Sequence, residues 1–171
     1  MQRQDYESAR ESLLSSSYST FNKSGQRFLD VCSQYGPARR AIEAIRPTEV
    51  VYDRVRDALE NHEDPTPVDG SGHLPFCLGL FRAVINGGED AAPLLGVILS
   101  GCNKLDMGLY VYRTQFLRPL IGHIDRYIAQ AETKRTSRSD RFVKAAWLIT
   151  AAVLGGFLTK LGEWLWRVLA G

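Results

Sequence analysis

The sequence predicts an all-α protein, a compact bundle of about five to seven helices followed by a C-terminal membrane-associated helix. Apolar residues recur at spacings of three, four and seven along most of the chain, and no segment alternates cleanly at a period of two. These two observations predict the bundle. A third, the uncharged run 145–159 near the C-terminus, predicts the membrane helix.

The first helical segment is expected over residues 5–32, whose apolar positions fall on one helix face. The serine run 15–17 and Gly25 weaken this pattern, so the segment is either one helix or two. Gly36 is expected to end it. Pro37 then suits the first turn of a second helix, because its missing N–H would be unpaired there in any case.

Pro47 should end that second helix, which runs over 37–45. Thr48 is a plausible N-cap for a third helix, and Glu49 would favour the positive end of its dipole. This helix should reach about Asn61. The prolines and turn-forming residues that follow predict a surface loop.

Residues 74–85 are almost wholly apolar and end in glycines, which predicts a buried helix with a glycine stop. Residues 89–100 follow as another helix, with Pro93 in its first turn and Gly101 closing it. A last helix of the bundle should open at Asp106. Pro119 lies inside its apolar stripe and is expected to kink or split it.

The apolar run predicts a membrane anchor. As a helix, 145–159 is about 22 Å long against a hydrocarbon core of about 30 Å, and an extension through Trp166 reaches about 33 Å. It therefore spans the bilayer, lies in its interface, or forms the central helix of the bundle, and we expect the first. The anchor residues are Trp147, Leu148, Ile149, Val153, Leu154, Phe157, Leu158, Trp164 and Trp166.

Basic residues precede the apolar run and predict its orientation. They favour the cytoplasmic side and attract anionic headgroups. The cluster comprises Lys134, Arg135, Arg138, Arg141 and Lys144, with Asp140 as the one acid. The predicted organisation is a cytosolic bundle over 1–132, a basic linker over 133–144 and an anchor over 145–171.

Two further patterns in this segment are compatible with self-association, the alternative for the small residues being that they simply face lipid. Small residues four apart let helices approach closely in lipid, and here they are Ala151 with Gly155 and Ala152 with Gly156. A polar stripe of Lys160, Glu163 and Arg167 falls on one helix face and could pair between copies.

Composition sets limits on function. The net charge of +2 is too small to indicate a nucleic-acid-binding protein. The N-terminus has no apolar core of the kind a secretory signal needs, so the bundle should stay in the cytoplasm. The three cysteines Cys32, Cys77 and Cys102 lack Cys-x-x-Cys spacing and are expected to be reduced, buried thiols.

The loop from His62 to His73 holds metal-type side chains, including Glu63, Asp64 and Asp69. Their spacing matches no zinc or calcium pattern, so we expect no metal site. The sequence contains no phosphate-binding glycine loop and no helical zinc motif, and no cofactor or small-molecule substrate is expected.

Two pairs, Arg56 with His62 and Arg118 with His123, resemble the short Arg…His motif of the HEPN ribonucleases, which are helical bundles that cleave RNA. In that family the arginine and histidine polarise the phosphate and move the proton. The resemblance covers seven and six residues, and Pro119 follows Arg118 where the family has a polar residue. It implies a membrane-tethered ribonuclease as one alternative.

The sequence favours a membrane-anchored, non-enzymatic interaction module at the cytoplasmic face, in single-pass topology and either as a monomer or as an oligomer. Its expected partners are the lipid bilayer and either another protein or a second copy. The principal alternative is a membrane-disrupting effector of the pore-forming, holin or abortive-infection type.

Overall fold

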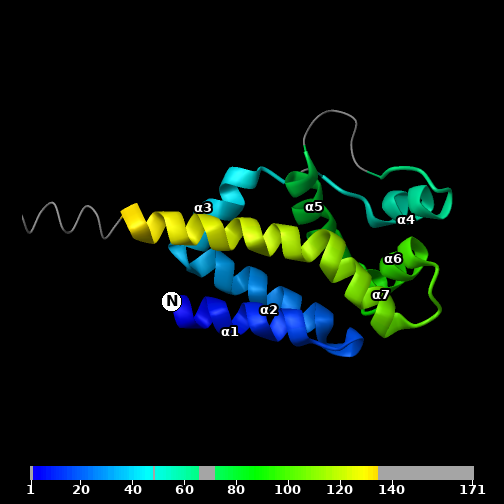
Figure 1. The fold of residues 1–171 in the computed structure, drawn as a ribbon, viewed down its shortest axis with the longest axis horizontal. Coiled ribbons are helices and arrows are strands. Elements are labelled where there is room, and N and C mark those ends of the chain that lie inside the picture. The colour runs from blue at the N-terminus through cyan, green and yellow to red at the C-terminus, as the bar shows by residue number, and fades with distance from the viewer. Residues whose placement is uncertain (1, 48, 66–71, 135–171) are drawn as a thin grey trace, which may run out of the picture. The chain divides into compact units, whose positions relative to one another are not determined.

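The computed structural model describes residues 2–47, 49–65 and 72–134. The chain divides into two units, residues 1–128 and 129–171. In the described residues there is no strand, and the predicted all-α bundle is confirmed (Figure 1). The elements are α1 (Arg3–Ser15), the 3-10 turn η1 (Tyr18–Thr20), α2 (Phe21–Gln34), α3 (Gly36–Ile45), α4 (Tyr52–Glu60), α5 (His73–Asn86), α6 (Ala91–Ser100), α7 (Leu105–Tyr112) and the π-helical turn η2 (Arg113–Leu117).

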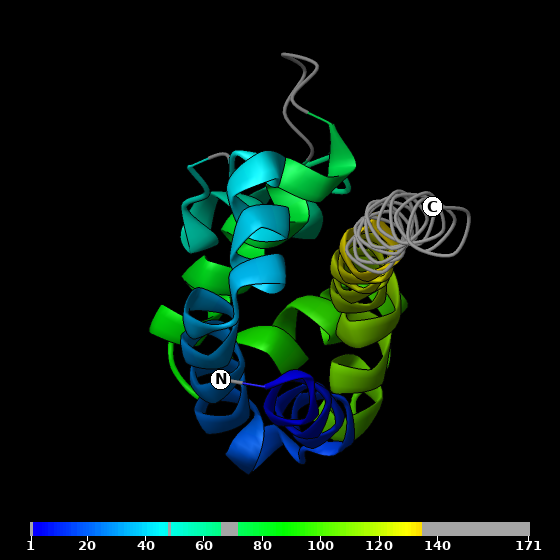
Figure 2. The same ribbon diagram turned by 90° about the vertical axis from the view of Figure 1, so that its left-hand side faces the viewer.

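The serine run divides the first predicted segment into α1 and α2. Ser16 adopts an extended backbone, and its hydroxyl donates to the Leu13 carbonyl oxygen at 2.8 Å. The Ser17 N–H donates to the Thr20 hydroxyl at 3.0 Å and so begins η1. The hydroxyl groups of Ser16 and Thr20 thus supply hydrogen bonds that a continuous helix would have made. The two helices pack side by side (Figures 1 and 2).

The second predicted helix is confirmed as α3, with Pro37 in its first turn. The predicted start of the third helix is wrong. α4 begins at Tyr52, its N-cap is Val51 with no side-chain cap, and Thr48 lies outside the described residues. The Tyr52 hydroxyl donates to the Ala91 carbonyl oxygen at 3.1 Å, so contact with α6 positions the start of α4.

Two of the three predicted glycine stops are placed as expected, whereas Gly36 does not end α2 and is instead the first residue of α3. α5 ends before Gly87, and Asn22 from α2 donates to the carbonyl oxygens of Ile85 at 3.3 Å and Gly88 at 2.7 Å. This amide therefore caps the C-terminal end of α5 from another helix. Gly101 closes α6 in the left-handed conformation at φ +63°, which favours glycine.

Pro119 does not split its helix, contrary to one of the two predicted outcomes. Helical backbone continues from α7 through η2 and over 118–134. In η2 the Arg118 N–H donates to the Arg113 carbonyl oxygen, five residues back. This wider turn just before the proline accommodates its ring, as π-bulges often do.

An aromatic cluster lies at the centre of unit 1. Phe21 stands edge-on to Phe81 and Tyr112, with ring centroids 6.3 and 5.8 Å apart. Phe28 packs against both Phe81 and Tyr6. Because these rings come from α1, α2, α5 and α7, their burial joins the helices into one core.

Candidate functional site

Most of the predicted site residues follow Lys134 and lie outside the described residues. Lys134 itself is exposed at the last described helical position. The anchor, the small-residue pairs, the polar stripe and the linker boundaries remain predictions. The residues concerned are Arg135, Arg138, Arg141, Lys144, Trp147, Leu148, Ile149, Ala151, Ala152, Val153, Leu154, Gly155, Gly156, Phe157, Leu158, Lys160, Glu163, Trp164, Trp166 and Arg167.

Within the described ranges, no single helix is long and apolar enough to cross a membrane. Two consecutive helical stretches, Ala91–Ser100 and Leu105–Lys134, are together long and apolar enough, but the chain bends by 88° between them.

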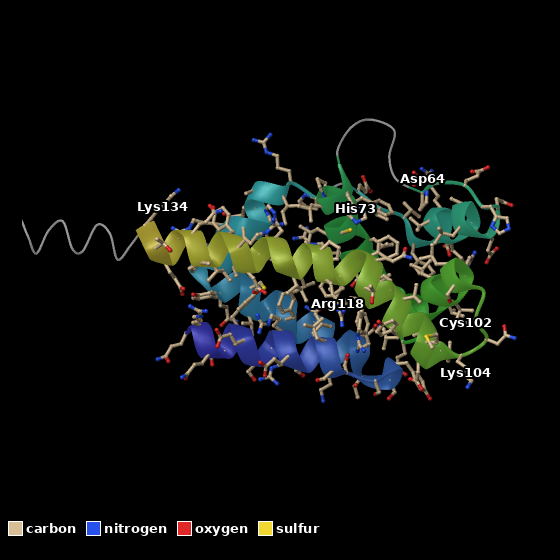
Figure 3. The ribbon with its side chains drawn as sticks, viewed as in Figure 1. Asp64, His73, Cys102, Lys104, Arg118 and Lys134 are labelled. Atoms are coloured by element: carbon tan, nitrogen blue, oxygen red, sulfur yellow. The ribbon has the colours of Figure 1, made fainter. Side chains whose placement is uncertain are left out.

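The loop after α4 does not gather metal ligands in the part that the structure describes. No group of three or more His, Cys, Asp or Glu side chains there could hold a metal ion. His62, Glu63 and Asp64 are exposed, and Asp69 lies outside the described residues. His73 belongs to the first turn of α5 (Figure 3).

The two Arg…His pairs lie on different elements. Arg56 lies on α4 among three carboxylates, those of Asp53, Asp57 and Glu60, at 3.3, 3.1 and 3.7 Å. Arg118 and His123 share a helical segment, where five positions amount to about 140° of rotation. They therefore point from different sides of that helix, and the ribonuclease alternative remains a prediction.

Burial divides the cysteines into two kinds. Cys32 and Cys77 are fully buried as expected, and burial raises the pKa of each thiol to about 12. The prediction of burial is wrong for Cys102, which is half-buried in the turn after α6. The Ser100 hydroxyl donates to its sulfur at 2.9 Å and lowers its pKa. All three thiols are free.

At mildly alkaline pH, one thiol of the native protein should react with maleimide. Cys102 should be labelled quickly, because the reactive species is the thiolate and this thiol is both accessible and the one with a lowered pKa. Cys32 and Cys77 should be labelled only in denaturant. Mass spectrometry of the peptides checks this, and Cys102→Ser should abolish native labelling. Rapid labelling of Cys77 in that variant would contradict the buried thiols.

A polar cluster at the surface, with one buried member in Cys77, joins α5 to η2, and the sequence pattern alone did not reveal it. The His73 Nε2 lies 3.3 Å from the Gln115 carbonyl oxygen and 3.3 Å from the Cys77 sulfur. Pro119 lacks the N–H that would bond Gln115 in a regular helix, and His73 occupies that carbonyl instead. The four-residue spacing of His73 and Cys77 was the available signal. The high thiol pKa makes Cys77 a poor nucleophile.

A second cluster holds the end of α1. One terminal nitrogen of Arg113, Nη2, donates to the Leu13 carbonyl oxygen at 3.2 Å, to the Ser16 hydroxyl at 2.6 Å and to the Ser16 carbonyl oxygen. The guanidinium also lies over the Phe21 ring, 5.7 Å from its centroid. Burial and the neighbouring Arg118 lower the pKa of Arg113. These contacts satisfy carbonyl groups that the helix end leaves unpaired.

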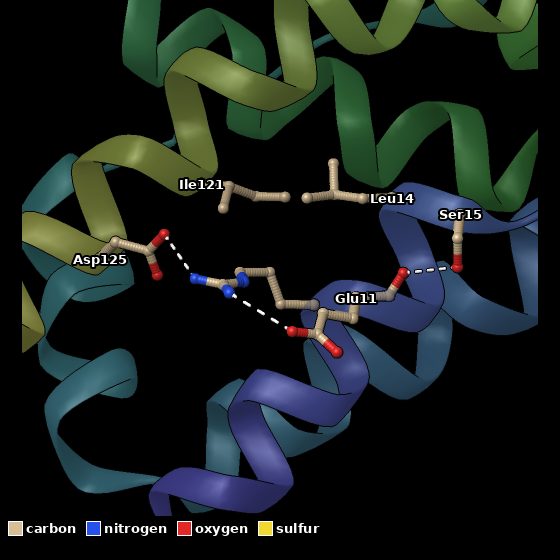
Figure 4. A pocket seen from close by; sticks show the side chains of 6 residues that line it. Glu11, Leu14, Ser15, Ile121 and Asp125 are labelled. Atoms are coloured by element: carbon tan, nitrogen blue, oxygen red, sulfur yellow. Dashed lines mark hydrogen bonds and ion pairs between the residues drawn. The ribbon is translucent and has the colours of Figure 1, made fainter.

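A shallow groove of about 520 Å³ runs between α1 and the helical residues 118–128 (Figure 4). Asp125 accepts hydrogen bonds from the Tyr6 hydroxyl at 2.8 Å and from Arg10 Nη1 at 3.1 Å. Leu14 and Ile121 face one another beside this network (Figure 4). Burial, followed by the bond to Asp125, raises the pKa of Tyr6. The paired charges hold α1 against this helix.

The exposed apolar side chains gather on a few elements that contact one another. Met107 and Tyr110 lie one turn apart on α7 and are 50% and 55% exposed. Contacts link α7 to α6 and η1, and α6 to α4. Figure 1 shows α4, α6 and α7 at the same end of unit 1. The large apolar residues exposed in the described part of the chain are Tyr18, Val51, Leu94, Met107 and Tyr110.

The same elements are strongly acidic. Residues 49–65 and 87–112, named here the acidic end, hold nine carboxylates and three cations, a formal net charge of −6. All nine acidic residues are exposed. Figure 3 shows Asp64, Cys102 and Lys104 in this region. Since the whole chain carries +2, the charge is unevenly distributed.

Comparison with known proteins assigns no family: no protein-family model matches the chain, and no curated protein or solved structure matches it significantly.

Proposed function

We propose that this protein is a membrane-anchored, non-enzymatic interaction module that presents its helical bundle at the cytoplasmic face. The observation that carries the proposal is the acidic end, where apolar side chains such as Met107 and Tyr110 are half-exposed. Exposed apolar side chains gathered on a soluble domain commonly mark an interaction surface. Their position on helices of a packed core gives them a fixed presentation.

The anchoring part of the proposal rests on the order of residues near the C-terminus. A basic cluster immediately before an uncharged run of fifteen residues, 145–159, is the arrangement expected at the cytoplasmic end of a single span. Trp147 on one side and Trp164 with Trp166 on the other are placed as interfacial aromatic residues. The predicted topology is single-pass.

The non-enzymatic part is supported by the use of the polar side chains that lie between helices. Asp125 is engaged by Tyr6 and Arg10, and the guanidinium of Arg113 is engaged by the end of α1. The His73 ring lies within hydrogen-bond distance of the Gln115 carbonyl oxygen, beside the Cys77 thiol, whose pKa is raised. Each of these clusters joins two helices, and this structural role accounts for their chemistry.

Carbonate extraction tests the anchor. The full-length chain, expressed at modest level, should remain with membranes through an alkaline wash. The double variant Val153→Arg/Leu154→Arg should move to the soluble or extractable pool, because each arginine at the centre of a span costs about 2.5–3.5 kcal/mol on insertion scales. Extraction of the unmodified chain would contradict an integral anchor.

One observation favours a membrane-disrupting effector as the second candidate. α6 carries no charged residue. Together with Leu105–Lys134 it has the length and composition of a membrane span that is interrupted by a bend. Under this proposal, expression would collapse the membrane potential, and Val153→Arg/Leu154→Arg would prevent the collapse. Harmless overexpression would leave the interaction module as the better proposal.

A further inference from the structure

We infer that the acidic end binds a cationic amphipathic helix of a partner protein. The inference rests on the proposed function, because it names the partner class of that interaction module. Two properties of the acidic end carry it: apolar side chains that project from packed helices, and a surplus of exposed carboxylates on the same elements.

The apolar part of the surface comes from two neighbouring helices. On α7, Met107 and Tyr110 are separated by three positions and half-exposed. On α6, Leu94 is 42% exposed, and Ile98, one turn further along, is partly buried. Helical stripes of this kind are what an amphipathic helix packs against when it docks on a bundle. Methionine and tyrosine adapt well to a partner surface.

The two helices present these side chains on a rigid support. Gly96 and Gly108 face each other where α6 crosses α7, and their backbones are in direct contact. The Tyr52 hydroxyl bonds the first residue of α6, so α4 also braces the pair. A preorganised surface loses less conformational entropy on binding than a mobile one.

The charge around the apolar residues selects the partner. Glu49, Glu89 and Asp106 are exposed, and none makes an ion pair within the described residues. On α4 the carboxylates outnumber the arginine that they share, Arg56. A cationic helix would complement this field and would be steered toward it.

The same charge disfavours the other two occupants. The cytoplasmic leaflet is anionic and would repel a surface whose formal net charge is −6. A two-fold contact with a second copy would bring two such surfaces together. A cationic amphipathic helix meets neither penalty, since it offers lysine or arginine on one face and leucine-like side chains on the other.

The test uses the full-length chain in phosphatidylcholine nanodiscs and a fluorescent probe helix built from leucine and lysine. Anisotropy should show saturable binding beyond that of empty nanodiscs, weakening at high salt. The matched probe, with glutamate in place of lysine, should not bind. Met107→Ser/Tyr110→Ser should weaken binding about tenfold or more, the scale of a lost pair of anchors.

A second pair of variants separates charge from fold. Glu49→Gln/Glu89→Gln should weaken lysine-probe binding at low salt, whereas Glu11→Gln on α1 should leave it unchanged. Unaltered circular dichroism would confirm that each variant folds. Equal binding of the glutamate probe, or unchanged binding by Met107→Ser/Tyr110→Ser, would overturn the inference.

Further outcomes distinguish the occupants and the two proposals. A fluorophore on Cys102 that is quenched by lipid-borne quenchers in anionic vesicles would overturn the inference in favour of a bilayer contact. Dimerisation abolished by Met107→Ser/Tyr110→Ser would overturn it in favour of a second copy. If the chain is extracted by carbonate but still binds the lysine probe, only the proposed membrane anchor is contradicted. If it stays in the membrane but does not bind the probe, only this inference is contradicted.

Discussion

Replacement of Gly96 by alanine should destabilise the protein by about 3 kcal/mol or more, at the upper end of what overpacking costs. A Cβ at this position would overlap the Gly108 carbonyl oxygen and lie 2.5 Å from its carbonyl carbon. These are backbone atoms, so no side-chain rotation can relieve the overlap. α6 and α7 would have to separate, and the side chains packed across their crossing would lose contact.

The reciprocal substitution should behave similarly. A Cβ on Gly108 would overlap the Pro93 carbonyl oxygen and lie 2.9 Å from the Val97 nitrogen. Urea denaturation followed by circular dichroism measures both changes. If either variant unfolds entirely, the loss of native signal at low temperature is itself the expected direction.

Gly122→Ala is the matched control, because this glycine is also helical and nothing lies within 4 Å of an added Cβ. Alanine there should be neutral or stabilising by about 0.5–1 kcal/mol, since it removes glycine's extra conformational entropy. Equal effects at Gly96 and Gly122 would contradict the close crossing.

Arg113→Met should destabilise the protein by about 2–4 kcal/mol, which is the cost of leaving buried acceptors without a donor. Methionine retains much of the apolar stem but loses the donors that reach the Leu13 and Ser16 carbonyl oxygens. It also loses the cation above the Phe21 ring. The end of α1 would then be unpaired in a site that excludes most water.

Arg118→Met provides the control for this substitution. Arg118 is exposed on the same helix, and its charge lowers the pKa of Arg113. Its removal should change stability by no more than about 0.5 kcal/mol. Thermal unfolding separates the two variants, and equal melting temperatures would show that Arg113 does not cap α1.

Local chemistry explains why most of the helix ends could be predicted. Pro37 begins α3 and Gly101 ends α6, because proline and glycine restrict or permit particular backbone angles regardless of their surroundings. The start of α4 was misplaced at Thr48. A good capping residue indicates where a helix can begin, but Tyr52 and its bond to α6 decide where this one does begin.

Pro119 also shows which features follow from local residue chemistry and which depend on tertiary contacts. The missing N–H is a property of the residue, and a disturbance was predicted from it. The helix widens into η2 and continues, and His73 reaches the carbonyl of Gln115 from another helix. No spacing within residues 105–134 contains that information.

The sequence by itself determined the helical class, most of the turn positions and the apolar, basic-flanked C-terminal segment, because each follows from residue type and local spacing. Only the tertiary structure brought α4, α6 and α7 together and so joined residues 49–65 to 87–112 in one acidic end. Only the tertiary structure brought Arg113 into contact with the end of α1 and Gly96 against Gly108. Such contacts depend on packing between distant segments, which a local pattern does not encode.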